Sequence, residues 1–296
     1  MRETFHACDP NRAFPVDVAP GAHYGHRVFS LADKVIVIIG GTTGLGLSAA
    51  RACAAAGGHV VVVGRDPENA RAAAAALGSR GEGLAGDAMD PRTAERAIEL
   101  ALERFRGFHG LYHVAGGSGR RQGDGPLHEV TDEGWRYTLD ENLGALFHSN
   151  RAAVKRFLAD GTPGSILNMG SVLARHPSPR HFATHAYAAA KAAVEGLTRS
   201  AAAYYAPRGI RFNLVAPALV ETPMARRASG DAGIMAYIRT KQPLDGGRIG
   251  APSDLDAAVV YFLSDASRFV TGQVLHIDGG WSVTEGLPAG EPSQAP

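Results

Sequence analysis

Apolar and polar positions along the chain follow two alternating patterns. Residues 35–39 (VIVII) are a continuous β-branched run, which is typical of a strand buried on both faces of a sheet, and residues 59–63 (HVVVV) indicate the next buried strand. Shorter apolar runs indicate further strands at 83–86, 111–114, 165–169, 210–215 and 273–277. Segments of helical composition or spacing separate them. This alternation predicts an α/β fold: a doubly wound parallel sheet (Rossmann fold) of seven strands with helices on both faces.

The same pattern divides the chain into one domain and two flanking segments. Residues 1–30 contain Pro10, Pro15 and Pro20 and no periodicity, which indicates an irregular arm. Residues 31–284 form the single predicted domain, and residues 285–296 a flexible tail. The longest connection with helix potential covers 221–250, and we expect it to be a lid over the substrate.

A helix predicted over 132–158 carries Trp135, Leu139, Leu143, Leu146 and Phe147 at helical spacing, so these five side chains are expected in the core. Asn142 is a polar residue among them. A buried amide needs hydrogen-bond partners, which suggests a structural or water-holding role for this side chain.

The segment after the first strand is rich in glycine. Gly40-Gly41-Thr42-Thr43-Gly44-Leu45-Gly46 separates the strand 35–39 from an alanine-rich helix. Strand, glycine turn and helix in this order form a phosphate site, because main-chain N–H groups at the helix start can approach a pyrophosphate. The spacing is Gly-x3-Gly-x-Gly rather than the common GxGxxG. We predict nucleotide binding here, with a plain strand-to-helix turn as the alternative.

The end of the second strand bears on the choice of cofactor. Gly64 and Arg65 follow this strand, and an arginine there can bind the 2′-phosphate of NADP(H). Asp66 precedes Pro67 and is interpreted as the N-cap of a helix over 67–77. NADP(H) is therefore favoured. In the alternative, Arg65 is solvated and Asp66 binds the adenosine ribose of NAD(H).

The run from Thr184 to Ala206 predicts a long helix that carries Tyr187 and Lys191, four positions apart on one face. A neighbouring ammonium favours the phenolate and lowers the pKa of a tyrosine, which can then exchange a proton with a carbonyl or alcohol oxygen. We place the chemistry on this pair together with Ser171 upstream. Two ordinary surface residues are the alternative.

Composition narrows the choice of partners. A net charge of +1 gives no electrostatic reason to expect nucleic acid or a membrane surface, and no apolar run is long enough to span a bilayer. The two cysteines, Cys8 and Cys53, form no disulfide framework, and Cys53 is expected to be a small buried hydrophobe. The N-terminus has no secretory h-region. We expect a cytoplasmic protein with a small-molecule substrate.

Several of these residues occur in an order shared with a known family. The order is Gly40/Gly44/Gly46, Asp87, Ala115-Gly116, Asn142, Ser171, Tyr187-x3-Lys191, Pro217, Thr222 and Asp278-Gly279-Gly280. In these positions the sequence resembles the short-chain dehydrogenases/reductases, in their compact single-domain branch, over residues 33–283.

The resemblance implies a catalytic set. Tyr187 would be the general acid/base, and Lys191 would lower its pKa and bind the nicotinamide ribose. Ser171 would hydrogen-bond the substrate carbonyl, and Asn142 would hold a water that links Lys191 to solvent. Hydride would move between nicotinamide C4 and the carbonyl carbon.

The resemblance also implies a cofactor site and an assembly. Asp87 and Ala88 would lie near the adenine, while Pro217, Val220 and Thr222 would flank the nicotinamide amide. The full predicted cofactor set is Gly40, Thr42, Thr43, Gly44, Leu45, Gly46, Arg65, Asp87, Ala88, Ala115, Gly116, Tyr187, Lys191, Pro217, Val220 and Thr222. Family habit implies a homo-oligomer, a dimer or a tetramer.

Three functions stay open at this point. The first is an NADP(H)-preferring carbonyl reductase or alcohol dehydrogenase. The second is an NAD-dependent dehydrogenase of a sugar, polyol or hydroxy acid. The third is a dinucleotide-binding sensor without catalysis, which the intact set of Ser171, Tyr187, Lys191 and Asn142 disfavours because a sensor needs no acid/base.

Two departures from the family pattern are informative. His113 and Val114 stand where the family usually has Asn-Asn, and a structural histidine that replaces an asparagine hydrogen bond is the preferred interpretation of His113. The segment between Ser171 and Tyr187 is three residues longer than usual and is basic.

We hypothesise that Arg175 and Arg180 of this longer loop, with Arg120 and Arg121, favour a substrate bearing a carboxylate or phosphate. A solvated basic loop is the alternative. No metal site is predicted, because His176, His181 and His185 lack a regular ligand spacing.

Overall fold

The computed structural model describes residues 29–286, so almost all of the predicted arm and tail lies outside the described residues. Its strands are β1 (Val35–Ile39), β2 (His59–Gly64), β3 (Gly81–Ala85), β4 (Gly110–His113), β5 (Gly164–Met169), β6 (Ile210–Pro217) and β7 (Val274–Ile277). Its α-helices are α1 (Gly44–Ala55), α2 (Pro67–Leu77), α3 (Pro91–Phe105), α4 (Asp132–Leu139), α5 (Ala145–Asp160), α6 (His185–Tyr205), α7 (Arg226–Ser229), α8 (Ala232–Lys241) and α9 (Asp256–Leu263).

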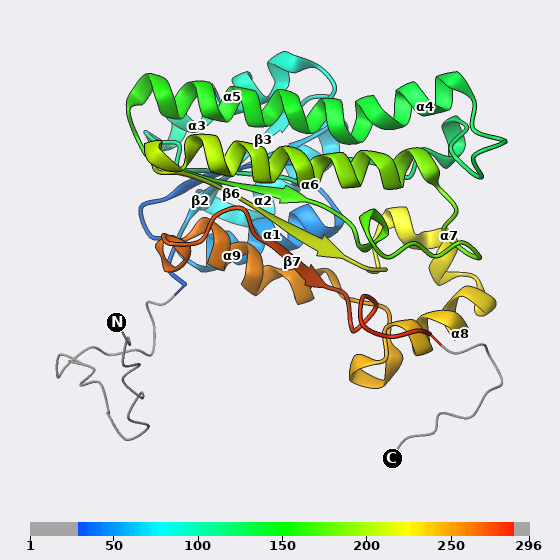
Figure 1. The fold of residues 1–296 in the computed structure, drawn as a ribbon. Coiled ribbons are helices and arrows are strands. Elements are labelled where there is room, and N and C mark those ends of the chain that lie inside the picture. The colour runs from blue at the N-terminus through cyan, green and yellow to red at the C-terminus, as the bar shows by residue number, and fades with distance from the viewer. Residues whose placement is uncertain (1–28, 287–296) are drawn as a thin grey trace, which may run out of the picture.

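The seven strands form one sheet in the order β3-β2-β1-β4-β5-β6-β7, and every neighbouring pair is parallel. The strand order reverses between β1 and β4. This confirms the predicted doubly wound sheet, and it places the ligand-binding edge at the carboxyl ends of the strands. Figure 1 shows α4, α5 and α6 along one face of the sheet and α1 and α9 along the other.

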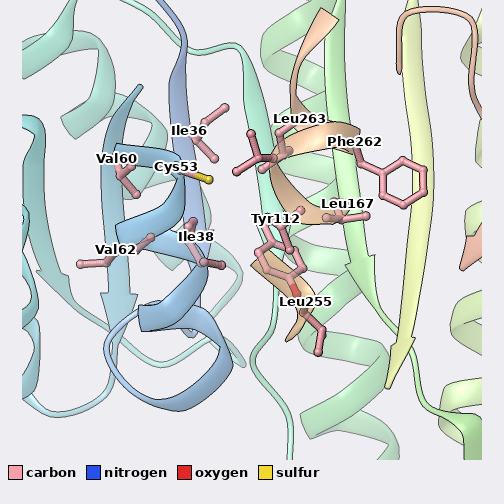
Figure 2. Packing of buried hydrophobic residues seen from close by; sticks show 14 of the residues in the cluster. Ile36, Ile38, Cys53, Val60, Val62, Tyr112, Leu167, Leu255, Phe262 and Leu263 are labelled. Atoms are coloured by element: carbon pink, nitrogen blue, oxygen red, sulfur yellow. The ribbon is translucent and has the colours of Figure 1, made fainter. Parts of the chain in front are cut away.

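Alternate residues of the central strands pack into two separate cores. Ile36 and Ile38 of β1 point to the core under α1 and α9, while Val35, Val37 and Ile39 belong to the core on the opposite face. Figure 2 shows the first core, in which Ile36, Ile38 and Cys53 lie near Leu255 and Leu263 from the C-terminal part of the chain. The continuous β-branched run of β1 is thus explained by burial on both faces.

Cys53 belongs to this first core. Its side chain is fully buried, and burial raises the pKa of its thiol to about 12. The interpretation of Cys53 as a buried hydrophobe is confirmed, since such a thiol is not a nucleophile near neutral pH.

The helix predicted over 132–158 differs from the prediction in two ways. A π-helical turn over Asp140–Gly144 separates α4 from α5. Trp135 and Phe147, expected in the core, are 39% and 43% exposed, whereas Leu146 is fully buried. The core prediction was wrong for the two aromatic residues: α4 buries Gly134 and Thr138 instead of Trp135, and α5 packs through a face that carries Ala153 and Phe157 instead of Phe147.

Within residues 29–286, the model contains no helix with the length and apolar character that a membrane span requires.

Candidate active site

A cavity of about 540 Å³ runs along the carboxyl ends of the strands. With the exception of Gly46, every predicted catalytic and cofactor residue lines it: Ser171, Tyr187, Lys191 and Asn142, and Gly40, Thr42, Thr43, Gly44, Leu45, Arg65, Asp87, Ala88, Ala115, Gly116, Pro217, Val220 and Thr222. Residues from six of the strand ends, those of β1 to β6, therefore converge on a single cavity.

Gly46 lies behind the cavity wall, where it determines the shape of the glycine turn. A Cβ at Gly46 would lie 2.0 Å from the carbonyl oxygen of Gly40, and a Cβ at Gly40 would lie 2.6 Å from the main-chain nitrogen of Ala115. Gly40 has φ 88°, a left-handed conformation that glycine adopts readily. These close approaches bring the start of α1 against the end of β4 and leave the N-terminus of α1 open to the cavity.

The end of β2 follows the predicted local structure. The Asp66 carboxylate accepts hydrogen bonds from the main-chain nitrogens of Glu68 at 2.8 Å and Asn69 at 3.3 Å, which confirms that Asp66 caps α2. Arg65 is exposed and lines the cavity. Its positive charge opposes the rise that burial causes in the pKa of Tyr137. The Asp66 carboxylate also lines the cavity, but it is engaged by the main chain at the start of α2.

Glu141 is an acidic residue of the site that the sequence analysis did not single out. Its carboxylate is part-buried against the main chain of Gly117 and accepts a hydrogen bond from the Tyr137 hydroxyl at 3.4 Å. Burial raises the pKa of Glu141, and the positive charge of Arg65 opposes that shift. Arg65 thus has a nearby counter-charge inside the cavity. The position of Glu141 directly before Asn142 was the available indication in the sequence.

The catalytic set is assembled at the start of α6. Lys191 Nζ is buried, donates to the Met169 carbonyl oxygen at 3.0 Å, and lies 5.5 Å from the centre of the Tyr187 ring. Ser171 lies close enough to the Tyr187 hydroxyl to affect its pKa. Ser171 Oγ in turn accepts from the Leu173 main-chain nitrogen at 3.2 Å. A phenol, an ammonium and a hydroxyl therefore meet at one end of the cavity.

Burial dominates the electrostatics of this set. Burial raises the pKa of Tyr187, and the interaction with Ser171 acts in the opposite direction. It lowers the pKa of Lys191 to about 8, and the negative charge of Glu141 opposes the change. Desolvation disfavours the phenolate of Tyr187 and the ammonium of Lys191, so it favours the neutral phenol and the neutral amine. We expected Lys191 to lower the pKa of Tyr187. In the structure, Ser171 rather than Lys191 opposes the rise in this pKa that burial causes.

Asn142 lies in the π-helical turn and is fully buried. Its amide nitrogen donates to the Thr138 and Gly117 carbonyl oxygens, both at 2.9 Å, and its amide oxygen accepts from the Gly117 nitrogen at 3.2 Å. The side chain therefore joins the helix to the glycine loop after β4. π-helical turns of this kind frequently occur at functional sites.

His113 has the structural role that its position suggested. The side chain is 1% exposed, Nε2 lies 3.1 Å from the Ala115 carbonyl oxygen, and Nδ1 lies 2.7 Å from Ser149 Oγ. A neutral ring with its hydrogen on Nε2 satisfies both contacts. Burial lowers the pKa of His113 to about 3, so the ring is uncharged at neutral pH.

Asp124 was not predicted to belong to the site. It is 6% exposed, and its carboxylate oxygens accept from the main-chain nitrogens of Ala186 at 3.0 Å and Tyr187 at 2.9 Å. Thr184, at the N-cap position of α6, makes no side-chain capping bond. Asp124 therefore caps the catalytic helix from a loop about sixty residues earlier, and its negative charge suits a helix N-terminus.

The other end of the cavity is lined by apolar groups and by arginine. Leu173, Phe182, Ala228 and Trp281 line it, and the Phe182 and Trp281 rings are 5.8 Å apart, edge to face. Of the arginines that the sequence analysis named here, Arg120 lines the cavity. Arg175 instead donates to the buried Glu195 carboxylate at 2.5 Å. Arg227, in the segment predicted as a lid, also lines the cavity and was missed.

Comparison with known proteins agrees with this architecture. A family model described as enoyl-(acyl carrier protein) reductase matches residues 40–282. The chain belongs to the short-chain dehydrogenase/reductase family and is an oxidoreductase.

Three relatives illustrate the range of this family. The chain is 35% identical to a 2,5-dichloro-2,5-cyclohexadiene-1,4-diol dehydrogenase of Sphingobium indicum, over 85% of this chain and 98% of that protein. It is 32% identical to the 3-oxoacyl-(acyl-carrier-protein) reductase FabG of Escherichia coli, over 83% and 96%. A solved gluconate 5-dehydrogenase of Burkholderia cenocepacia, in complex with NADP and tartrate, superposes with a TM-score of 0.78 at 30% identity, over 86% and 98%.

Proposed function

We propose that the protein is an NAD(P)-dependent dehydrogenase/reductase that interconverts a carbonyl compound and a secondary alcohol, with NADP(H) preferred. The main support is that Ser171, Tyr187 and Lys191 line the same cavity as the glycine turn. The turn fits a dinucleotide, because side chains at Gly40 and Gly46 would collide with the main chain that opens the N-terminus of α1. Arg65 is placed to bind a 2′-phosphate, and Asp87 and Ala88 to contact the adenine.

In this proposal the bound nicotinamide supplies or accepts the hydride at its C4 position. Ser171 and Tyr187 hydrogen-bond the substrate oxygen and fix it in position. During reduction, the Tyr187 hydroxyl gives its proton to that oxygen; during oxidation, the phenolate takes it back. Lys191 would bind the nicotinamide ribose.

The raised pKa of Tyr187 favours the protonated phenol, which is the form that reduction requires. Asn142 fixes the loop beside Lys191, which is where a water connecting Lys191 to solvent would be held. Pro217, Val220 and Thr222 line the same cavity and would flank the nicotinamide amide. Residues 221–250 would act as the lid.

The experiment that tests this proposal combines cofactor binding with turnover. Calorimetric titration should give a preference for NADPH over NADH of about tenfold, which is 1.4 kcal/mol. Tyr187→Phe should lower kcat for any carbonyl substrate by about a thousandfold and leave the Kd of the cofactor unchanged. Tyr204→Phe, on the exposed side of the same helix, is the matched control. A Tyr187→Phe enzyme with full activity would exclude the acid/base role.

An NAD(H)-dependent dehydrogenase of a sugar, polyol or hydroxy acid is the second candidate. Glu141 favours it, because a carboxylate beside Arg65 weakens the attraction of that cation for a 2′-phosphate. A clear preference for NADH in the same titration would select this candidate. A cofactor-binding sensor without catalysis would bind the cofactor and show no turnover with any member of a broad carbonyl panel.

We also propose that the protein forms a homo-oligomer, a dimer or tetramer. Trp135, Phe147 and Leu158 of α4 and α5 and Tyr204 of α6 are exposed apolar residues on neighbouring elements, and a second copy would cover them. Light scattering after size-exclusion chromatography measures the mass directly, and a monomer at micromolar concentration would contradict this assembly.

A further inference from the structure

Two guanidinium groups from distant segments meet at the substrate end of the cavity. Arg120 lies in the loop between β4 and α4, and Arg227 lies in α7. Both donate to the same acceptor, the main-chain carbonyl oxygen of His181, at 3.3 and 3.4 Å. Both also line the cavity that contains Ser171 and Tyr187. The two cations are therefore held close together beside the catalytic groups.

Nothing among the described residues neutralises this pair directly. Neither guanidinium forms an ion pair within residues 29–286. The pKa of Arg120 is lowered by burial and by the like charge of Arg227, and the smaller effect of Asp124 opposes this shift. The Asp124 carboxylate is already bound to the start of α6. One neutral carbonyl leaves most of the ten N–H donors of two guanidiniums available.

The arginine pair sits on a defined scaffold. Gly119, directly before Arg120, has φ 65°, and a Cβ there would collide with Thr138 at 1.9 Å. Asp124 fastens the same loop to the catalytic helix. Next to Arg227, the buried Ala228 packs in an apolar cluster with Trp281. Arg120 is part-buried and Arg227 is exposed, and their shared acceptor, the His181 carbonyl oxygen, lowers the cost of ordering them around an oxyanion.

We propose that the substrate carries an oxyanion, a carboxylate or a phosphate ester, which Arg120 and Arg227 bind jointly while its apolar body packs against Phe182 and Trp281. Guanidinium groups suit this task because their donors match the geometry of both oxyanions. The proposal rests on the proposed function, since it names the substrate class of the same cavity. Arg227 takes the place that the sequence analysis gave to Arg175 as a partner of Arg120, because Arg175 is paired with Glu195.

The test measures binding and needs no knowledge of the natural substrate. Cyclohexanecarboxylate and cyclohexanecarboxamide, which have the same shape and differ in charge, are titrated into the protein with and without saturating NADP+. The carboxylate should bind at least tenfold more tightly than the amide. Arg120→Gln and Arg227→Gln should each weaken carboxylate binding by about tenfold, the effect of one charge-assisted hydrogen bond, and leave amide binding unchanged.

Arg121→Gln is the matched control, because Arg121 is the exposed neighbour of Arg120 and is not a cavity residue. It should bind the carboxylate like the wild type. Cyclohexyl phosphate serves as a third probe: tighter binding than the carboxylate, with the same dependence on both arginines, assigns a phosphate ester as the preferred anion.

Equal affinity for acid and amide, or binding of neither, would overturn the anion site even if NADPH binds normally. Failure of NADPH to bind, with the carboxylate preference intact in the free protein, would overturn the proposed function and leave the anion site standing.

Discussion

The two ends of the cavity are built in different ways. The cofactor end is made of short turns at the ends of β1, β2 and β4, where glycines let one main-chain segment approach another. The substrate end is made of side chains from four separate segments: Arg120, the loop from Leu173 to Phe182, α7 and Trp281. The first depends on local chain geometry, and the second depends on how distant segments come together.

This difference has a consequence for mutation. A substitution at the cofactor end acts on a main chain that cannot move aside, so its effect on stability is large. A substitution at the substrate end removes one side chain from an otherwise intact wall, so its effect falls mainly on ligand binding. The predictions below test this contrast.

Gly46→Ala should disrupt the main-chain geometry of the cofactor end. Its Cβ would lie 2.0 Å from the Gly40 carbonyl oxygen, and both groups belong to the rigid junction of β1 and α1. We expect the free energy of unfolding to fall by about 3 kcal/mol, with loss of measurable cofactor binding. Urea unfolding and calorimetry measure the two effects.

The control for this change is Gly196→Ala in α6. A Cβ at Gly196 meets no atom within 4 Å, so alanine there should stabilise the helix by roughly 0.5–1 kcal/mol. If Gly46→Ala proved as harmless as Gly196→Ala, the close approach of Gly46 and Gly40 would not determine the cofactor end.

The cofactor end could be predicted from the sequence because it depends on local chain geometry. The strand runs, the glycine turn and the Asp66 cap are properties of contiguous residues, and the structure places them as expected. Tyr187 and Lys191 were predicted together because a helix puts positions four apart on one face. Each of these features needs only a short stretch of chain to be recognised.

His113→Asn tests the junction between the two ends. The folded-state pKa of His113 is about 3, below the ordinary 6.5, so the unfolded chain binds more protons between these values. Stability from this group is therefore present above pH 6.5 and is lost as the pH falls towards 3. Wild type should lose roughly 3 kcal/mol of unfolding free energy from this group between neutral pH and about pH 4.

The His113→Asn protein lacks this titration, so its stability should fall less steeply with acid than that of the wild type. His128→Asn removes an exposed histidine and should leave the acid dependence unchanged. Urea unfolding at each pH measures the unfolding free energies of both proteins. If these fell in parallel with acid, His113 would not stay neutral in the fold.

Asp124→Asn weakens the link between the Arg120 loop and the catalytic helix. A neutral amide is a poorer cap for the Ala186 and Tyr187 nitrogens, so we expect to lose about 1 kcal/mol of stability. The start of α6 also positions the Tyr187 side chain, and kcat should fall about tenfold. Steady-state kinetics and urea unfolding check the two effects.

The matched control is Asp90→Asn, which changes the N-cap of α3 at a residue that does not line the cavity. It should lower stability to a similar extent and leave kcat unchanged. A fall in kcat for both variants, or for neither, would mean that Asp124 acts through stability alone.

Apart from Glu141, the parts of the site that the sequence did not reveal depend on long-range contacts. Asp124 caps a helix about sixty residues away, and Arg227 meets Arg120 only through the His181 carbonyl between them. Trp135 of α4 and Phe147 of α5 have helical spacing like core residues, yet each lies on a face of its helix that stays exposed. No contiguous pattern distinguishes such residues, because burial and pairing are decided by the tertiary arrangement.

Glu141→Gln should produce the smallest effect of these variants. It tests how far a side-chain charge, as opposed to main-chain geometry, matters at the cofactor end. The carboxylate beside Arg65 would repel an incoming 2′-phosphate, and it reduces the positive potential that Arg65 presents. At a partly solvated site, removing one such charge changes binding by less than about 1 kcal/mol. We expect the ratio of NADH to NADPH dissociation constants to rise about threefold, with Asp140→Asn, an exposed neighbour, as the control. Because the repulsion is electrostatic, the change should shrink at high salt. A shift of equal size for both nucleotides would instead indicate that Glu141 acts on a part of the cofactor that they share.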